Sequence, residues 1–239
     1  MREEFTRTGM LLGEAAMERL SRARVAVFGI GGVGGYVVEA LARSGIGTLE
    51  IIDCDRVALS NINRQIIATH ETVGMSKTAA AAARIAAIDP ECHVTCHELF
   101  FGEDTAGQLD FSAFDYIADA VDTVTAKLLL IKKAREHNVP IISCMGTGNK
   151  LDPTALRVSD IYETSVCPLA RVMRYELRKA GIDSLRVVWS NEKPISHPGI
   201  RDGETGKTVP GSVSFVPPAA GLIMAGEIIR DISGVGKKH

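Results

Sequence analysis

Residues 25–34 read Val-Ala-Val-Phe-Gly-Ile-Gly-Gly-Val-Gly. The apolar run predicts a short strand, and the glycines predict a tight turn into a helix over residues 35–44. Such a turn lets backbone amides and the helix dipole approach a phosphate group. Asp53 ends the next apolar run, where a carboxylate can accept hydrogen bonds from ribose hydroxyls. This stretch predicts a nucleotide site, and it leaves a dinucleotide and ATP both open. Its glycines are Gly29, Gly31, Gly32 and Gly34.

Strand-like and helix-like segments alternate through the first two thirds of the chain. Helical patterns cover residues 35–44, 77–88 and 124–137, and apolar strand-like runs cover residues 25–28, 49–53, 94–99, 116–120 and 139–144. This alternation is typical of βαβ units. It predicts an α/β, Rossmann-like doubly wound fold, with a mostly parallel sheet and helices on both faces. This part of the chain supplies about five strands.

The regular alternation of strand-like and helix-like segments ends at Thr147. We expect a mixed C-terminal extension with strands over 156–161 and 185–190 and a basic helix over 168–179. The polar run 191–211 predicts a mobile crossover loop, and a final apolar helix over 216–232 should pack back on the sheet. We expect one domain over residues 1–239, with a nucleotide-binding part over about 20–150 and a substrate and crossover part over about 151–239.

The composition excludes several classes of protein. A formal charge of −2 over 239 residues gives no global field that would draw the chain non-specifically onto nucleic acid or an anionic membrane. The five cysteines are odd in number and lie in or beside apolar runs, which indicates reduced thiols and a cytoplasmic location. The start, Met-Arg-Glu-Glu, lacks the features of a signal peptide, and the apolar stretch 219–226 is too short to span a bilayer.

Two cations after the second strand favour ATP over a dinucleotide. A triphosphate carries charge beyond the pyrophosphate that the first helix terminus serves, and Arg64 and Lys77 could neutralise it. Taken singly, each is more often an ordinary surface cation. Asp122 closes the fourth strand at the carboxyl edge and could hold a magnesium ion. The alternative is that Asp122 caps the following helix.

Several motifs together resemble the ubiquitin-activating-enzyme-like superfamily, which adenylates carboxylates. They are Gly-Ile-Gly-Gly-Val-Gly at 29–34, Asp-Cys-Asp at 53–55, Asn-Ile-Asn-Arg-Gln at 61–65, Gly-Met-Ser-Lys at 74–77 and Asp-Ala-Val-Asp at 119–122. Residues 5–7, 146–148, 152–153 and 168–170 extend the resemblance over nearly the whole chain, where it is most similar to the tRNA threonylcarbamoyladenosine dehydratase branch. This implies that ATP adenylates the threonylcarbamoyl carboxylate on adenosine 37 of tRNA, and that ring closure expels AMP.

The resemblance also implies roles for particular residues. Asp53 would contact the ribose, Asp122 would hold magnesium, and Asn61, Arg64 and Lys77 would contact the phosphates. Asp55, Asn63 and Gln65 lie in the same motifs and join the four glycines as candidate cofactor ligands. A homodimer would bring Arg7 to the partner subunit's ATP, although Arg2 and Arg19 share its segment and a solvated helix face explains all three equally well. The resemblance leaves room for a sulfurtransferase-type protein partner.

The cysteines allow two further readings. Related enzymes that activate sulfur carriers hold zinc with two Cys-x-x-Cys pairs, which this chain lacks. Cys92 and Cys96 would share one face of a strand with His93 on the other, so we expect buried apolar thiols there rather than zinc ligands. Cys167 precedes a basic helix and is a candidate catalytic thiol, with an inert thiol as the alternative.

A basic cluster follows Cys167. It consists of Arg171, Arg174, Arg178 and Lys179, with Arg186 on the next strand. It could bind tRNA phosphates, or it could be the solvated face of an amphipathic helix. Aromatic residues that could stack on a splayed base are Tyr162, Tyr175, Trp189 and Phe215.

Three other functions stay open at this point. An adenylyltransferase for the C-terminal glycine of a ubiquitin-like sulfur carrier would use the same ATP site, but the missing zinc cysteines argue against it. An NAD-dependent oxidoreductase fits the glycine fingerprint and leaves Arg64, Lys77 and Asp122 without a shared task. A non-catalytic adaptor would bind ATP without turnover.

Overall fold

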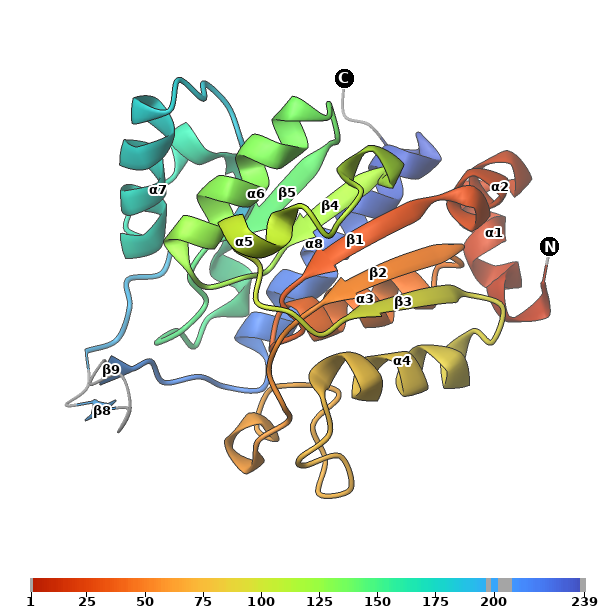
Figure 1. Ribbon diagram of the computed structural model, residues 1–239, viewed down its shortest axis with the longest axis horizontal. Coiled ribbons are helices and arrows are strands. Elements are labelled where there is room, and N and C mark those ends of the chain that lie inside the picture. The colour runs from red at the N-terminus through yellow and green to blue at the C-terminus, as the bar shows by residue number, and fades with distance from the viewer. Residues whose placement is uncertain (1, 197–198, 202–207, 237–239) are drawn as a thin grey trace.

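The computed structural model describes residues 2–196, 199–201 and 208–236. Seven strands form one sheet in the order β3-β2-β1-β4-β5-β7-β6 (Figure 1). All neighbouring strands are parallel except β6, which pairs antiparallel with β7. The predicted α/β, mostly parallel sheet is confirmed. The strands are β1 (Arg24–Phe28), β2 (Thr48–Ile52), β3 (His93–His97), β4 (Tyr116–Asp119), β5 (Ile141–Cys144), β6 (Leu156–Asp160) and β7 (Arg186–Ser190).

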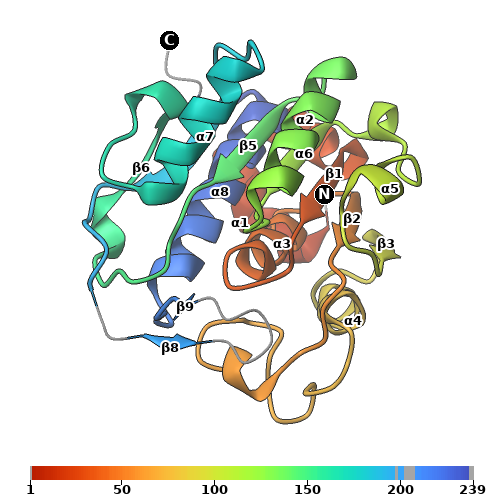
Figure 2. The same ribbon diagram turned by 60° about the vertical axis from the view of Figure 1, so that its left-hand side comes forward.

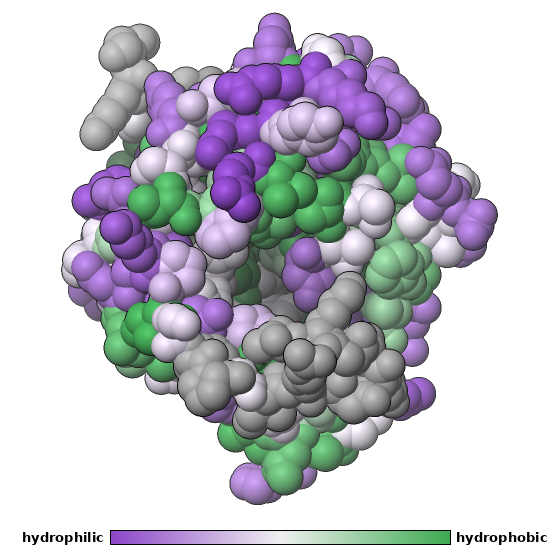
Figure 3. Space-filling view, turned by 90° about the vertical axis from the view of Figure 1, so that its left-hand side faces the viewer, coloured by the Kyte–Doolittle hydropathy of each residue, from purple (hydrophilic) through white to green (hydrophobic). Residues whose placement is uncertain are grey.

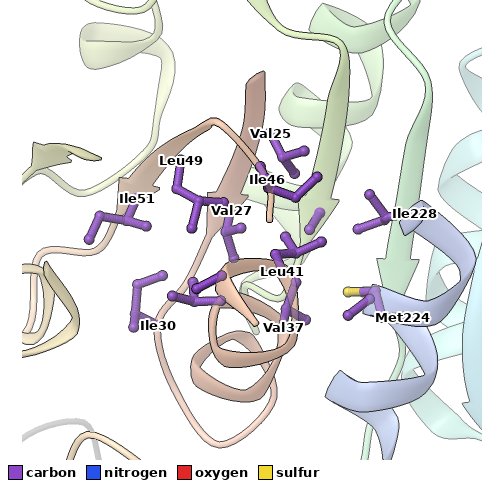
Figure 4. Close-up of a cluster of buried hydrophobic side chains, with 14 of the residues drawn as sticks. Val25, Val27, Ile30, Val37, Leu41, Ile46, Leu49, Ile51, Met224 and Ile228 are labelled. Carbon is purple, nitrogen blue, oxygen red and sulfur yellow. The ribbon is translucent and has the colours of Figure 1, made fainter. Parts of the chain in front are cut away.

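Helices cover both faces of this sheet because its strands are apolar on both sides. Val25 and Val27 of β1 belong to a core shared with α3, α4 and α8, whereas Ala26 and Phe28 face α5 and α6 (Figures 2 and 4). A third cluster packs α7 against β7 and α6. The helices are α1 (Thr6–Leu12), α2 (Glu14–Arg22), α3 (Gly34–Ala42), α4 (Lys77–Ile88), α5 (Glu103–Ala106), α6 (Val124–Glu136), α7 (Pro168–Lys179) and α8 (Val216–Ser233).

The sheet reverses its winding at β1, which has β2 on one side and β4 on the other. The helix after β1 covers one face and the helix after β4 covers the opposite face. The two connections therefore diverge at the carboxyl edge, which is where open α/β sheets bind their ligands. The segments that meet there are residues 29–34 and 120–123.

The predicted elements agree closely with the structure, and α4 and α7 match their predicted ranges to the residue. The structure adds α1 and α2 before the first strand. It also adds an antiparallel pair, β8 (Ile200–Arg201) with β9 (Thr208–Val209), inside the predicted crossover loop. The rest of that loop prediction falls partly on residues 197–198 and 202–207, outside the described residues. Within the described residues, no helix has the length and apolarity needed to cross a membrane.

The start of the chain is held by an ion pair between Arg2 and Asp89 at the end of α4. The Asp89 side chain is fully buried. Burial alone would raise the pKa of Asp89, but hydrogen bonds from Arg2 and from the backbone amide of Glu91 outweigh it, so the pKa lies below its usual value. Since the pKa is lowered on folding, this contribution to stability is present above about pH 3.9 and is lost as the pH falls further.

We predict that Asp89→Asn lowers the free energy of unfolding at pH 7 by about 1–3 kcal/mol, because the Arg2 charge loses its partner. The difference from the unmodified chain should be constant from pH 6 to about pH 4 and shrink as the pH falls from about 4 to 2, measured by urea denaturation. Glu91→Gln is the matched control, since Glu91 is exposed and 3.6 Å from Arg2. A difference that stays constant down to about pH 2 would contradict the assignment.

Candidate nucleotide-binding site

The glycine turn at residues 29–34 is closed so tightly that one position admits only glycine. A Cβ atom on Gly34 would lie 1.8 Å from the carbonyl oxygen of Gly29. The turn leads into α3, whose N-terminus has no side-chain cap. The N-terminus of α3 and its helix dipole therefore face the carboxyl edge, as an anion site requires.

Asp53 is fixed against this turn rather than free at the end of β2. Its Oδ2 atom accepts a hydrogen bond from the backbone amide of Ile30 at 2.6 Å, and its Oδ1 atom accepts one from the amide of Asp55 at 2.8 Å. The carboxylate thus joins β2 to the glycine turn. It lies where the sequence predicts a ribose ligand.

Lys77 opens α4 directly after its N-cap residue, Ser76. The Lys77 side chain is only 7 % exposed, and its Nζ atom lies 2.6 Å from Asp55 Oδ2 and 3.6 Å from Asp53 Oδ1. Burial alone would raise the pKa of Asp55, but the hydrogen bond from Lys77 outweighs it, so the pKa lies below its usual value. The structure therefore brings this predicted cation beside the glycine turn, already paired with two carboxylates.

The segment 61–65 lies across the glycine turn. Arg64 donates to the carbonyl oxygen of Ser60 at 3.1 Å and to Asn63 Oδ1 at 3.0 Å. Its Cγ atom lies 3.3 Å from the place that a Cβ atom on Gly32 would occupy. Asn61 instead accepts a hydrogen bond from the amide of Ala58 at 3.0 Å, so its side chain holds the local turn.

Gln65 gives the clearest sign of a ligand. It is only 6 % exposed, and its Oε1 atom is the one buried side-chain polar atom without a hydrogen-bond partner in the part of the chain that the structure describes. Its Nε2 atom lies 3.9 Å from the place of a Cβ atom on Gly31. A buried carbonyl oxygen without a donor costs free energy, and a ligand with a hydroxyl or amino group would remove that cost.

Asp122 is exposed just beyond β4. Its Oδ1 atom accepts a hydrogen bond from the Thr123 hydroxyl at 3.2 Å, and the N-cap residue of α6 is Thr123, without a side-chain cap. The capping alternative for Asp122 is therefore wrong. An exposed carboxylate at the carboxyl edge fits magnesium, which takes few protein oxygens and keeps several waters.

Asp53, Cys54 and Asp55 offer three ligand atoms within 4.8 Å of one another. They fit a magnesium ion poorly, because Lys77 and the Ile30 amide already use the two carboxylates and a thiol is a soft ligand.

Arg7 lies on α1, beside the amino-terminal ends of the strands (Figure 1). The glycine turn lies at the opposite, carboxyl edge. Because α1 and the glycine turn lie at opposite edges of the sheet, Arg7 does not belong to the nucleotide site of its own chain.

The cysteines are all free, and the expectation of buried thiols at Cys92 and Cys96 is wrong, because Cys92 is half-buried and Cys96 is exposed. Burial raises the pKa of Cys144 to about 12 and that of Cys92 to about 11, and it also raises the pKa of Cys96. Cys167 is 2 % exposed at the start of α7, and its sulfur lies 3.8 Å from the place of a Cβ atom on Gly146. As the structure stands, this thiol is covered.

The residues of the basic cluster on α7 and β7 differ in their contacts. Arg174 donates to the carbonyl oxygen of Thr164 at 3.0 Å, so it holds the preceding loop. Arg186 is paired with Glu227 at 2.5 Å and Asp231 at 2.6 Å. Arg186 is nevertheless exposed, as are Arg171, Arg178 and Lys179 of α7.

The four aromatic candidates also divide. Trp189 is buried and donates to Ser159, and the Tyr162 ring lies under the Arg178 guanidinium at 4.9 Å. Tyr175 and Phe215 are 66 % and 47 % exposed. Figure 3 shows a hollow at the centre of the face in view, with a hydrophobic patch directly above it and hydrophilic residues gathered farther above.

Sequence reasoning missed two buried lysines. Lys127 of α6 is fully buried, and Lys150, which is 3 % exposed, donates to the carbonyl oxygens of Ser190 at 3.2 Å and Glu192 at 3.0 Å. Burial lowers the pKa of Lys150. A lysine in a polar or helical pattern normally predicts an exposed side chain, so no local signal distinguished either residue.

Comparisons with known proteins agree with this geometry. The model of the ThiF family matches residues 5–239. The tRNA threonylcarbamoyladenosine dehydratase of Bacillus subtilis is 41% identical over 245 residues, which cover 97% of this chain and 95% of that protein. The Escherichia coli tRNA N6-threonylcarbamoyladenosine dehydratase in complex with ATP has a TM-score of 0.88 at 33% identity, covering 98% of this chain and 95% of that chain. Its complex with AMP has a TM-score of 0.89 at 34% identity, with the same coverage.

We predict that Gly34→Ala lowers affinity for ATP by at least about tenfold, since the new methyl group must displace the Gly29 carbonyl and overpacking of this kind costs about 1–3 kcal/mol. Isothermal titration with ATP measures the loss, and thermal melting confirms that the variant is folded. Gly107→Ala is the control, because a Cβ atom there meets nothing within 4 Å. A folded Gly34→Ala variant with unchanged affinity would show that the turn does not bind the nucleotide.

Proposed function

Because the chain belongs to the ThiF family, we propose that it is an ATP-dependent enzyme that adenylates the carboxylate of threonylcarbamoyladenosine at position 37 of tRNA and cyclises it. The observation that carries the proposal is the closed glycine turn with Asp53 bound to it, Lys77 beside it and the unpaired Gln65 oxygen near it. The sequence identity of 41% to the Bacillus subtilis dehydratase, which extends over 97% of this chain, supports the choice of substrate.

In the first step the substrate carboxylate attacks the α-phosphorus of ATP, and pyrophosphate leaves. Two anions meet in this step, so cations and positioning supply most of the catalysis. Arg64 contacts the glycine turn and Lys77 pairs with Asp53 beside it, and both belong to the motifs of the family resemblance, so we assign the phosphates to them. Lys77 is held at its position by Asp55 and Asp53, which limits the rearrangement needed when phosphate binds.

In the second step the carbamoyl group of the same substrate attacks the activated carbonyl carbon, and AMP leaves with one former carboxylate oxygen. The nucleophile is part of the substrate, so this route needs no side-chain nucleophile. The burial of Cys167 agrees with that route. A Cys167→Ala variant that loses turnover would instead assign the thiol a covalent step.

We assign magnesium to Asp122, whose exposed carboxylate is a hard oxygen ligand. When bound, the ion would neutralise charge on the phosphates. The role of this chain in that arrangement is to hold one carboxylate at the carboxyl edge, near the end of β4.

We also propose a homodimer of single-domain subunits. Met10 and Leu11 of α1 are 77 % and 84 % exposed, which leaves an apolar surface beside Arg7. A second copy that covers this surface could receive Arg7 at its own nucleotide site, whereas Arg7 cannot reach the site of its own chain. A sulfurtransferase-type partner remains a separate proposal, supported by the family resemblance alone.

For the tRNA we propose a contact surface formed by the exposed residues of α7, namely Arg171, Tyr175, Arg178 and Lys179. Cations would bind the phosphates, and Tyr175 offers a flat face on which a base can stack. Phe215, which precedes α8, is the other exposed aromatic candidate and lies three residues after Ser212, whose carbonyl oxygen accepts from Asn63.

We predict that the protein, incubated with magnesium, ATP and tRNA bearing threonylcarbamoyladenosine, removes one water from the nucleoside and forms AMP in equal amount. Arg64→Ala should lower turnover by about 10²–10³-fold while the protein stays folded, because its charge is used in the transition state. Nucleoside mass spectrometry and an AMP assay measure both. Lys132→Ala, an exposed residue of α6, is the control. An unchanged nucleoside, with AMP formed only when a ubiquitin-like carrier is added, would favour the adenylyltransferase.

We predict that Arg7→Ala and Lys77→Ala are each nearly inactive and that mixing them restores activity. A mixed dimer contains one site with both its own Lys77 and the partner's intact Arg7. Random mixing therefore yields up to about a quarter of normal activity, since half the dimers are mixed and each has one complete site. Activity that stays absent after subunit exchange would contradict donation of Arg7 across the interface.

A further inference from the structure

Three fully buried polar side chains meet beneath the carboxyl edge. Asp119 ends β4, Lys127 lies on α6 and Ser143 lies on β5, and each is 0 % exposed. Lys127 Nζ donates to Asp119 Oδ2 at 2.9 Å and to Ser143 Oγ at 3.1 Å. The Ser143 hydroxyl donates to Asp119 Oδ2 at 2.5 Å. We call these residues the buried triad.

Stability alone does not account for the buried triad. Within the described residues it contains the one ion pair whose two side chains are both 0 % exposed. Removing two charges from water costs several kcal/mol per ion, and apolar residues of similar volume would often serve the core equally well. What an ion pair supplies beyond apolar packing is a fixed geometry between the elements that it joins.

The buried triad fixes both ends of the short segment that carries Asp122. At the first end, Asp119 Oδ1 accepts a hydrogen bond from the amide of Val121 at 3.2 Å. At the second end, the amide of Lys127 donates to the carbonyl oxygen of Thr123 at 3.0 Å in the first turn of α6. The residue between these two anchors with an exposed carboxylate is Asp122.

The same segment lies directly against the glycine turn. The amide of Ala120 donates to the carbonyl oxygen of Phe28 at 2.9 Å. The carbonyl oxygen of Ala120 lies 2.8 Å from the place that a Cβ atom on Gly29 would occupy. These two contacts set the place of the segment after β4, and with it Asp122, relative to the glycine turn.

We propose that Asp119, Lys127 and Ser143 are positioning residues that hold Asp122 at a fixed place relative to the glycine turn. This inference rests on the proposed role of Asp122. The buried triad touches neither nucleotide nor metal, and it acts through the backbone of residues 120–123.

The test uses the double variant Asp119→Asn/Lys127→Met, which removes both charges together and leaves no unpaired buried charge. Titration of magnesium into the protein–ATP mixture, without tRNA, should show apparent magnesium affinity about 10- to 100-fold weaker, the range for residues that orient a metal ligand. The backbone amide of Val121 should exchange its hydrogen faster in the ligand-free protein. ATP affinity without magnesium should stay within about threefold, a change of under 1 kcal/mol.

Ser143→Ala gives a milder test in case the double variant does not fold, because it leaves the ion pair intact. It should weaken apparent magnesium affinity about three- to tenfold, in line with the loss of the hydrogen bonds that the Ser143 hydroxyl makes with Asp119 and Lys127. Lys133→Met is the matched control on the same helix, where Lys133 forms a partly exposed pair with Glu136, and it should change nothing.

Unchanged magnesium affinity in folded Ser143→Ala and in the folded double variant would overturn the proposal. A parallel loss of melting temperature and of ATP affinity without magnesium would also overturn it, because it would assign the buried triad a purely structural role. If the unmodified protein binds magnesium and ATP but leaves the tRNA nucleoside unchanged, only the substrate assignment is refuted. An Asp122→Ala variant that binds magnesium as tightly as the unmodified protein would refute the role of Asp122 and, with it, this inference.

Discussion

The close approach of Gly34 to the carbonyl oxygen of Gly29 is the contact on which the rest of the site depends. It closes the turn between β1 and α3 so that helix amides face the carboxyl edge. The amide of Ile30, inside this turn, binds Asp53, and Asp53 lies beside the buried Lys77. A side chain at Gly34 would thus displace the turn and, through Ile30, the carboxylate and the cation as well.

Charges at this edge are mostly paired before any ligand binds. Lys77 is held by Asp55, and beneath the sheet edge Lys127 is held by Asp119. Against this background two groups stand out, the exposed carboxylate of Asp122 and the buried Gln65 oxygen without a donor. A preorganised site of this kind costs little rearrangement when phosphate and metal arrive, which is how electrostatic catalysis gains its strength.

Local pattern predicted the sheet and the turn because both depend on neighbours in sequence. A continuous apolar run predicts β1, and the helix-forming run 77–88 ends at Asp89-Pro90, which predicts α4 to the residue. Burial of a lysine depends instead on partners that are distant in sequence, as when Lys127 of α6 donates to Ser143 of β5. The engagement of Arg174 with Thr164 and the lack of capping by Asp122 likewise depend on loop geometry that residue types do not determine.

The central claim, adenylation of the substrate carboxylate, is tested most directly by labelling that carboxylate with ¹⁸O in threonylcarbamoyladenosine tRNA. Attack on the α-phosphorus places one labelled oxygen between the acyl group and AMP, and ring closure then leaves it on AMP. We predict that AMP from the reaction carries one ¹⁸O atom by mass spectrometry and that the cyclic nucleoside keeps the other. Label found in inorganic phosphate with ADP as the product, or AMP without label, would contradict the account.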